Sequence, residues 1–104
     1  MKTEAATRWL QRVGALQCVL CMYLGVRQRT PTMRHHVREG QGLGQRASDF
    51  LVVALCAECH QGPSGLHGLG TLGFYRRYKL DELDLLAMTI ELVAASTFTK
   101  GGTP

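Results

Sequence analysis

Cysteines and histidines are the residues of this 104-residue chain whose types and spacing could do chemistry. The four cysteines form two Cys-x-x-Cys pairs, Cys18 with Cys21 and Cys56 with Cys59. Two such pairs can place four thiolates around a single ion, and Zn²⁺ favours that ligand set. Because four protein thiolates leave no open position for a substrate, we expect this zinc to be structural. Buried or redox-active free thiols are the alternative.

The four histidines, His35, His36, His60 and His67, lie between or soon after these pairs. Imidazoles that converge can hold a divalent ion with open positions, or one of them can act as a general base near neutral pH. Hydrolysis of a phosphodiester uses both, a base for the attacking water and a cation for the developing charge. Neighbours in a regular strand point to opposite faces, so either the strand bends at His35 and His36 or one of the two is not catalytic. Ordinary surface or core positions are the alternative for each histidine.

The positive charge is concentrated in the part of the chain that holds these residues. Residues 1–80 carry eleven Lys and Arg against four Asp and Glu, whereas residues 81–104 carry one Lys against four acids. A basic cluster of this kind suits a nucleic-acid backbone, and a solvated face of a mildly basic protein is the alternative. The cluster around the double histidine contains Arg27, Arg29, Arg34, Arg38 and Arg46.

Length and composition favour a single small domain over residues 1–104. A hydrophobic content of 45% indicates a folded chain, and a domain of this size gains stability from a cross-link such as a bound metal. No apolar run is long enough for a membrane helix. Because charges interrupt residues 1–16, we expect no signal peptide, and we expect a cytoplasmic protein with reduced thiols.

Local patterns indicate which elements position these side chains. If the strand that holds His36 pairs with the strand that ends at Cys56, the histidines can converge. The expected elements are a helix over 3–13, irregular chain over 22–32, a strand over 32–38, a glycine-rich loop over 38–48, a strand over 49–56, a loop over 61–73, a short helix over 74–80 and a helix over 81–96.

The helix over 81–96 has the clearest pattern. Asp81 is the expected N-cap, and acids follow in the first turn. An apolar stripe at helical spacing predicts a face that packs in the core, with a partner surface as the alternative. The stripe contains Leu83, Leu86, Ala87, Ile90, Val93 and Ala94.

The stretch HHVREGQGLGQRASDFLVVALCAECHQGPSGLHG, with the CVLC pair before it, resembles HNH (His-Me finger) endonucleases. It is more specifically similar to the recombination-enhancement nucleases of phages and prophages. The resemblance covers residues 16–75, so the N-terminal segment and the last helix lie outside it. It implies an α+β fold with a small, zinc-stapled ββα-metal core and flanking N- and C-terminal helices.

The resemblance also implies roles for the motif residues. His36 matches the general base that activates water, and His35 matches the metal-ligand position before it. His60 matches the ligand that opens the α element, and His67 matches the final ligand. Asp49 lies near the position that orients the base. The cysteines match the structural zinc set.

Two spacings depart from the family pattern. Seven positions separate His60 from His67, with Pro63 between them, where many members keep their last two ligands one helical turn apart. A continuous helix cannot span that separation, so we expect His67 to return through a loop. Asp49 stands two residues further from the second cysteine pair than the usual Asn, and Leu51 occupies that usual spacing.

The activity implied by the resemblance is metal-dependent endonucleolytic cleavage of DNA. It implies a catalytic divalent ion, Mg²⁺ or Mn²⁺, beside the structural Zn²⁺. It also implies a phage- or prophage-encoded protein of a bacterial host that acts in recombination or DNA processing, with a recombinase as a further partner. The residues expected to contact the DNA backbone are Arg34, Arg38, Arg46, Arg76 and Arg77.

Two other functions remain open from the residues. One is a zinc-stapled nucleic-acid-binding module that does not cut. The other is a protein-interaction domain that docks a partner through the apolar side of residues 83–94.

Overall fold

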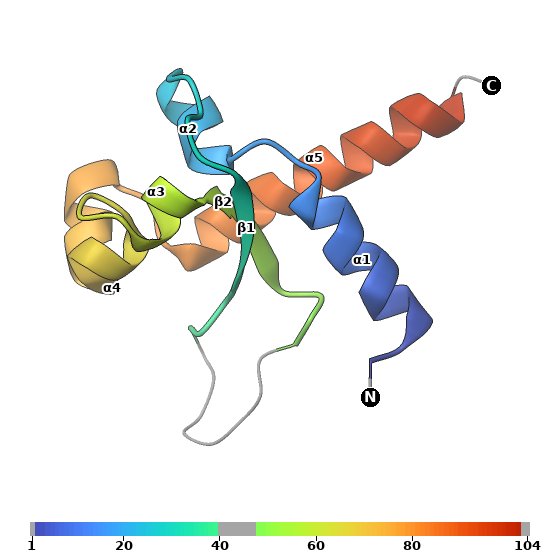
Figure 1. Ribbon diagram of the computed structural model, residues 1–104, viewed down its shortest axis with the longest axis horizontal. Coiled ribbons are helices and arrows are strands. Elements are labelled where there is room, and N and C mark those ends of the chain that lie inside the picture. The colour runs from blue at the N-terminus through green and yellow to red at the C-terminus, as the bar shows by residue number, and fades with distance from the viewer. Residues whose placement is uncertain (1, 40–47, 103–104) are drawn as a thin grey trace.

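The computed structural model describes residues 2–39 and 48–102. An antiparallel pair of strands lies at the centre, with helices on either side, so the architecture is α+β as expected (Figure 1). α1 lies on one side of the strand pair, and α3 and α4 lie on the other. The elements in chain order are α1 (Glu4–Gly14), α2 (Val19–Leu24), β1 (Thr32–His36), β2 (Val52–Cys56), α3 (Ala57–Gln61), α4 (Leu66–Tyr78) and α5 (Glu82–Gly102).

The two strands form where the sequence predicts them, but both are shorter. Thr32 pairs with Cys56 and His36 pairs with Val52, and every residue of β2 is buried. The ladder stops after the Val37 N–H, because the next backbone N–H groups donate to the carboxylate of Glu82 rather than to a strand. The predicted glycine-rich loop falls mostly on residues 40–47, which lie outside the described residues.

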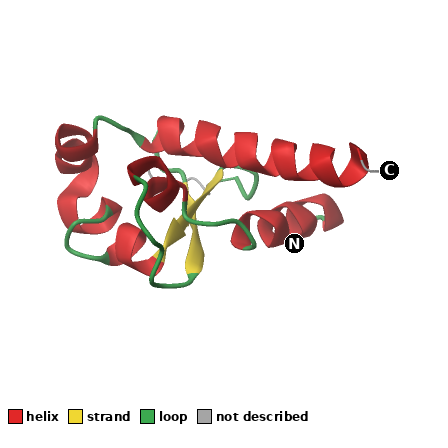
Figure 2. Cartoon of the chain, turned by 90° about the horizontal axis from the view of Figure 1, so that it is seen from above, coloured by secondary structure: helices red, strands yellow, loops and turns green. Residues whose placement is uncertain are grey.

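α5 covers the strand pair and protects the free edge of β2 (Figure 2). The backbone N–H of Ala54 donates to the hydroxyl oxygen of Thr89 at 3.3 Å, and that hydroxyl donates to the Leu85 carbonyl at 2.9 Å. A side chain of α5 therefore takes the place of a neighbouring strand, which blocks edge pairing at this position.

The predicted cap of the last helix is confirmed, whereas its predicted buried stripe is partly wrong. Asp81 accepts from the Asp84 N–H at 2.9 Å, and the Asp84 carboxylate accepts from the Asp81 N–H at 2.9 Å. Leu83 and Ile90 are 49% and 42% exposed, and Ala87 and Ala94 are exposed as well, so only two members of the predicted stripe are buried. The buried face includes the polar residues Glu82 and Thr89, which a search for apolar residues passes over. The other residues buried on this face are Leu85, Leu86 and Val93.

Two segments predicted to be irregular are helical. Met22–Leu24 belong to α2, and the predicted loop over 61–73 contains the end of α3 and the first half of α4, which kinks at Gly70. The glycines in this stretch allow helices to approach closely, as described below for the histidine cluster. The C-terminal helix also extends past the predicted end at residue 96, to Gly102.

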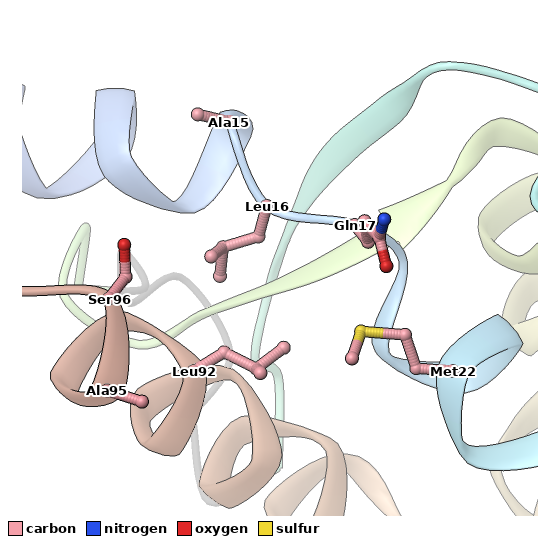
Figure 3. A pocket seen from close by; sticks show the side chains of 7 residues that line it. All are labelled: Ala15, Leu16, Gln17, Met22, Leu92, Ala95 and Ser96. Carbon is pink, nitrogen blue, oxygen red and sulfur yellow. The ribbon is translucent and has the colours of Figure 1, made fainter. Parts of the chain in front are cut away.

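An apolar hollow lies between the connection from α1 to α2, α2 itself and α5 (Figure 3). Leu16, Met22 and Leu92 line it, and none of its lining side chains is titratable. It is therefore not a candidate for acid–base or metal chemistry. In the described part of the chain, no helix combines the length and apolarity needed to cross a membrane.

Candidate metal centres and their surroundings

The four cysteines come together in a buried cluster, as their spacing predicts. The sulfur of Cys21 lies 3.9 Å from that of Cys56 and 3.8 Å from that of Cys59. Zinc–sulfur bonds of about 2.3 Å at tetrahedral angles place two sulfurs about 3.8 Å apart, whereas a disulfide needs about 2.05 Å. The cysteines are therefore free thiols arranged at metal-binding distance, and their donor type and geometry fit a structural metal such as zinc.

Hydrogen bonds fix each cysteine pair to the start of β1. Gln28 accepts from the Cys18 N–H at 2.6 Å and donates to the hydroxyl oxygen of Thr32 at 2.9 Å. On the other pair, the Ala57 N–H donates to the Pro31 carbonyl at 3.0 Å. The two pairs therefore meet because each one is bonded to the segment that enters β1.

The close approach of the four sulfurs shifts their pKa values in opposite directions. A hydrogen bond from Cys59, opposed by burial, lowers the pKa of Cys18 to about 5, and that same bond raises the pKa of Cys59. Burial raises the pKa of Cys21 to about 12. Without a metal the cluster thus favours a thiolate at Cys18 bonded to protonated neighbours. A zinc ion that takes thiolates must displace those protons.

Three histidines from three elements form a second cluster: His35 on β1, His60 on α3 and His67 on α4. The Nε2 atom of His60 lies 3.2 Å from Nδ1 of His35 and 3.0 Å from Nε2 of His67. His35 and His60 are buried, whereas His67 is exposed, so the cluster is open on one side.

The spacing of these ring nitrogens fits a shared cation. Metal–nitrogen bonds of about 2.1 Å at angles between octahedral and tetrahedral place two nitrogens about 3.0–3.4 Å apart. Hydrogen bonds alone satisfy the cluster poorly, because Nε2 of His60 carries either one proton or one lone pair and faces two other nitrogens. Three imidazoles can therefore supply one face of a metal site and leave positions for water or substrate.

Burial keeps two of these imidazoles in the neutral form that binds metal. It lowers the pKa of His60 to about 4, with further lowering by the neighbouring His35 and His67. It also lowers the pKa of His35, against the opposite effect of Glu82. Nδ1 of His60 is buried, and the described part of the chain gives it no hydrogen-bond partner.

The chain returns to the cluster through a turn over residues 62–65, as predicted, and His67 itself lies in the first turn of the helix that follows. α3 ends at Gln61 and α4 begins at Leu66, with a tight turn between them. The turn is close because glycines stand where the backbones meet. A Cβ atom on Gly65 would lie 2.5 Å from the Cys59 carbonyl oxygen, and one on Gly68 would overlap the Gly62 carbonyl oxygen.

His36 contacts a different partner from its neighbour, in keeping with the alternation of a regular strand. Its Nε2 atom lies 2.9 Å from Oδ1 of Asp49, and its side chain is 39% exposed. The carboxylate of Asp49 also lies 3.8 Å from the ammonium of Lys2. Three of the four histidines thus converge, and the fourth pairs with the carboxylate that the resemblance places near the base.

Glu82 is a residue of the site that the sequence patterns missed. It is 5% exposed, and its carboxylate bonds to Nε2 of His35. The nearest sequence signal was its place in the first turn of α5, where an acid is explained by the helix dipole alone. Nothing in the local sequence indicates that this turn faces β1.

The arginines predicted to contact DNA are exposed wherever the structure describes them. Arg34 and Arg38 lie on β1 and just after it, and Arg76 and Arg77 lie in the last turn of α4. The Arg34 guanidinium also donates to the Leu10 carbonyl at 3.3 Å, so this side chain has a structural contact as well. Arg46 lies outside the described residues.

No family model matches the chain, and no curated protein or solved structure matches it. Membership of the HNH endonucleases therefore stays a prediction from the motif.

Proposed function

We propose that this protein is a metal-dependent endonuclease that hydrolyses DNA phosphodiester bonds at a site of the HNH, ββα-metal type. The observation that carries the proposal is that two consecutive histidines have different surroundings, one suited to binding a metal and the other to acting as a base. His35 belongs to the three-nitrogen cluster, while His36 is half-exposed and paired with Asp49. A cation site and a held imidazole base are the two groups that phosphodiester hydrolysis needs.

In this proposal His36 removes a proton from the attacking water. The Nε2–H of His36 donates to Asp49, which leaves the Nδ1 lone pair to accept that proton. Asp49 also stabilises the imidazolium that forms. The ion held by His35, His60 and His67 would supply the positive charge that stabilises the phosphoryl oxygens and the departing 3′ oxygen. The products would carry 5′-phosphate and 3′-hydroxyl ends.

The donor set bears on which ion to test. Mg²⁺ and Mn²⁺, the ions implied by the resemblance, prefer oxygen ligands, whereas imidazoles suit Zn²⁺, Fe²⁺ and Ni²⁺. We therefore expect Ni²⁺ or Zn²⁺ to support activity at lower concentrations than Mg²⁺ or Mn²⁺. The structural zinc would occupy the cysteines in every case.

The test is nicking of supercoiled plasmid by pure, zinc-loaded protein, with each of these ions or with EDTA. We expect divalent-dependent nicking, and a loss of about 10²–10⁴-fold in His36→Ala with zinc content and DNA binding unchanged. Imidazole added to the buffer should restore part of the activity of His36→Ala, because the empty position can admit a free base. Equal nicking by His36→Ala and the wild type would contradict the assigned base.

A second candidate function is a zinc-stapled nucleic-acid-binding module that does not cut. A groove of about 660 Å³ beside Cys21 and Cys59 favours it, since Arg27, Arg29 and Arg77 line it against one acid, Glu58, which lies 3.7 Å from Arg29. Salt-sensitive DNA binding that weakens in Arg27→Ala and Arg29→Ala, with no cutting under any ion, would support this function. Cleavage of DNA in the presence of a recombinase would then be the remaining test of the nuclease. The phage or prophage origin stays a prediction.

A further inference from the structure

Glu82 connects the last helix to the histidine cluster. It is the first residue of α5, yet its carboxylate is buried beside β1. Its oxygens accept from the backbone N–H of Arg38 at 3.1 Å and from that of Glu39 at 2.8 Å, and one of them bonds to Nε2 of His35. A carboxylate is rarely buried without such partners, so its position is specified by β1 and by the histidine together.

The contact with Glu82 determines which ring nitrogen of His35 carries the proton, and therefore which one has a free lone pair. An ionised carboxylate only accepts hydrogen bonds, so the ring nitrogen beside it must carry the proton. In a neutral imidazole with the proton on Nε2, Nδ1 has the free lone pair. Nδ1 is the His35 atom that lies 3.2 Å from Nε2 of His60.

We propose that Glu82 is a positioning residue of the histidine cluster, which holds His35 in the Nε2–H tautomer and so presents its Nδ1 lone pair to a divalent cation shared with His60 and His67. The inference rests on the metal-binding part of the proposed function and not on DNA cleavage. A carboxylate that accepts from the far nitrogen of a metal-bound imidazole orients the ring and raises its basicity.

The charge of Glu82 adds a second reason for its position. The three imidazoles bring no negative charge to a dication, and Glu82 places one next to His35, on the ring nitrogen away from the cluster. α5, which lies outside the motif that resembles the nucleases, thereby becomes part of the site. The three nitrogen donors of the cluster suit a divalent cation such as Zn²⁺ or Ni²⁺.

The tautomer can be measured directly. The sample is ¹⁵N-labelled protein loaded with one equivalent of zinc. The four thiolates bind this zinc in preference, so the histidine cluster stays free of metal. Long-range ¹H–¹⁵N NMR correlations at neutral pH should show His35 protonated on Nε2 and unprotonated on Nδ1. A proton on Nδ1, alone or in addition to Nε2, would overturn the proposal, because Glu82 would then be only an ion-pair partner.

Glu82→Gln tests the consequence for metal binding. The amide keeps the shape of the side chain, but it has no charge and can donate to Nε2 of His35. We expect the affinity of the second metal equivalent, titrated as Ni²⁺ by calorimetry, to fall by about 10–100-fold. Glu91→Gln is the matched control, because Glu91 lies on the same helix and is exposed, and it should bind Ni²⁺ like the wild type.

These experiments distinguish a failure of the proposal for Glu82 from a failure of the proposed nuclease function. An unchanged Ni²⁺ affinity in folded Glu82→Gln would refute the role of Glu82, whether or not the protein cuts DNA. If Glu82→Gln does not fold, the tautomer in the wild type still decides. A wild-type protein with the expected tautomer and Ni²⁺ affinity that cuts no DNA would support Glu82 and refute the nuclease.

Discussion

The two clusters of this protein are built from different donors and are accessible to different degrees. Three of the four cysteines are buried and Cys59 is partly exposed, and their four thiolates would complete the shell of a tetrahedral ion. The three histidines leave one side open at His67, and the buried carboxylate of Glu82 bonds to one of them, His35. A closed shell can only hold the chain together, whereas an open one can admit water or a phosphate oxygen.

The clusters also differ in what the chain must do to form them. Each cysteine pair lies within four residues, so the fold only has to bring two short segments together. The histidine cluster needs β1, α3, α4 and the first turn of α5 to be placed correctly at the same time. We therefore expect the cysteines to determine stability, and we expect the histidines to be more sensitive to small shifts.

The largest expected effect is the loss of a cysteine. Cys56→Ser should lose zinc and unfold, because a structural zinc contributes about 10–16 kcal/mol in small domains, comparable with the whole stability of a protein of this size. His67→Ala should keep its zinc and change the free energy of unfolding by less than about 1 kcal/mol, because His67 is exposed. Zinc content and thermal unfolding by circular dichroism measure both.

A folded Cys56→Ser protein without zinc would break the comparison, because the cysteines would then not be the staple. Cys59→Ser is a useful companion variant, since Cys59 is the least buried of the four. It should lose zinc affinity as well if all four thiolates bind. Normal zinc retention in Cys59→Ser would reduce the ligand set to three.

A middle-sized effect is expected where α3 and α4 meet. In Gly68→Ala the new methyl group would overlap the backbone of Gly62 and Pro63, which cannot move aside as a side chain can. We expect a loss of about 1–3 kcal/mol in the free energy of unfolding. The shift of α4 should also carry His67 away and lower Ni²⁺ affinity at the histidine cluster.

Gly73→Ala is the matched control in the same helix. Its methyl group would lie 3.3 Å from the Leu69 Cβ atom, and the higher helix propensity of alanine offsets that contact by about 1 kcal/mol. Stability and Ni²⁺ affinity should both stay close to those of the wild type. Equal effects of Gly68→Ala and Gly73→Ala would show that the close approach does not position His67.

The difference between the clusters also explains what could be predicted from the sequence. The cysteine set could be found by spacing alone, because Cys-x-x-Cys fixes local geometry. His35 and His36 could be assigned to opposite faces because the alternation of strand residues survives in β1, whereas the place of Asp49 near His36 was implied only by the resemblance. His67 was assigned to the cluster from the resemblance, but glycines normally indicate loops, and the close packing of α3 on α4 is a tertiary property.

The last helix shows the limit most clearly. Apolar spacing predicts that Leu83 and Ile90 are buried, but they are exposed, and it gives no reason to expect the burial of Glu82 and Thr89, which are buried. Those two polar residues face β1 and the edge of β2, and their partners there are what allow them to be buried. A polar residue on a buried face cannot be recognised before its partner is known.

The smallest expected effect is the acid response of His60, and it separates the imidazole cluster from the thiolates. Burial lowers the pKa of His60 to about 4, against about 6.5 in an unfolded chain, so the unfolded state binds a proton first as pH falls. Stability from this group is complete above the unfolded pKa and is lost progressively between about pH 6.5 and pH 4.

In protein with one equivalent of zinc, His60→Asn should remove this loss, and the free-energy difference between the two proteins should change by about 1–2 kcal/mol from neutral pH to about pH 5. Urea unfolding at a series of pH values, with zinc retention checked at each, measures the difference. Parallel curves for the two proteins would mean that the imidazole of His60 reaches water more freely than its burial implies, and the histidine cluster would then be as open on its inner side as it is at His67.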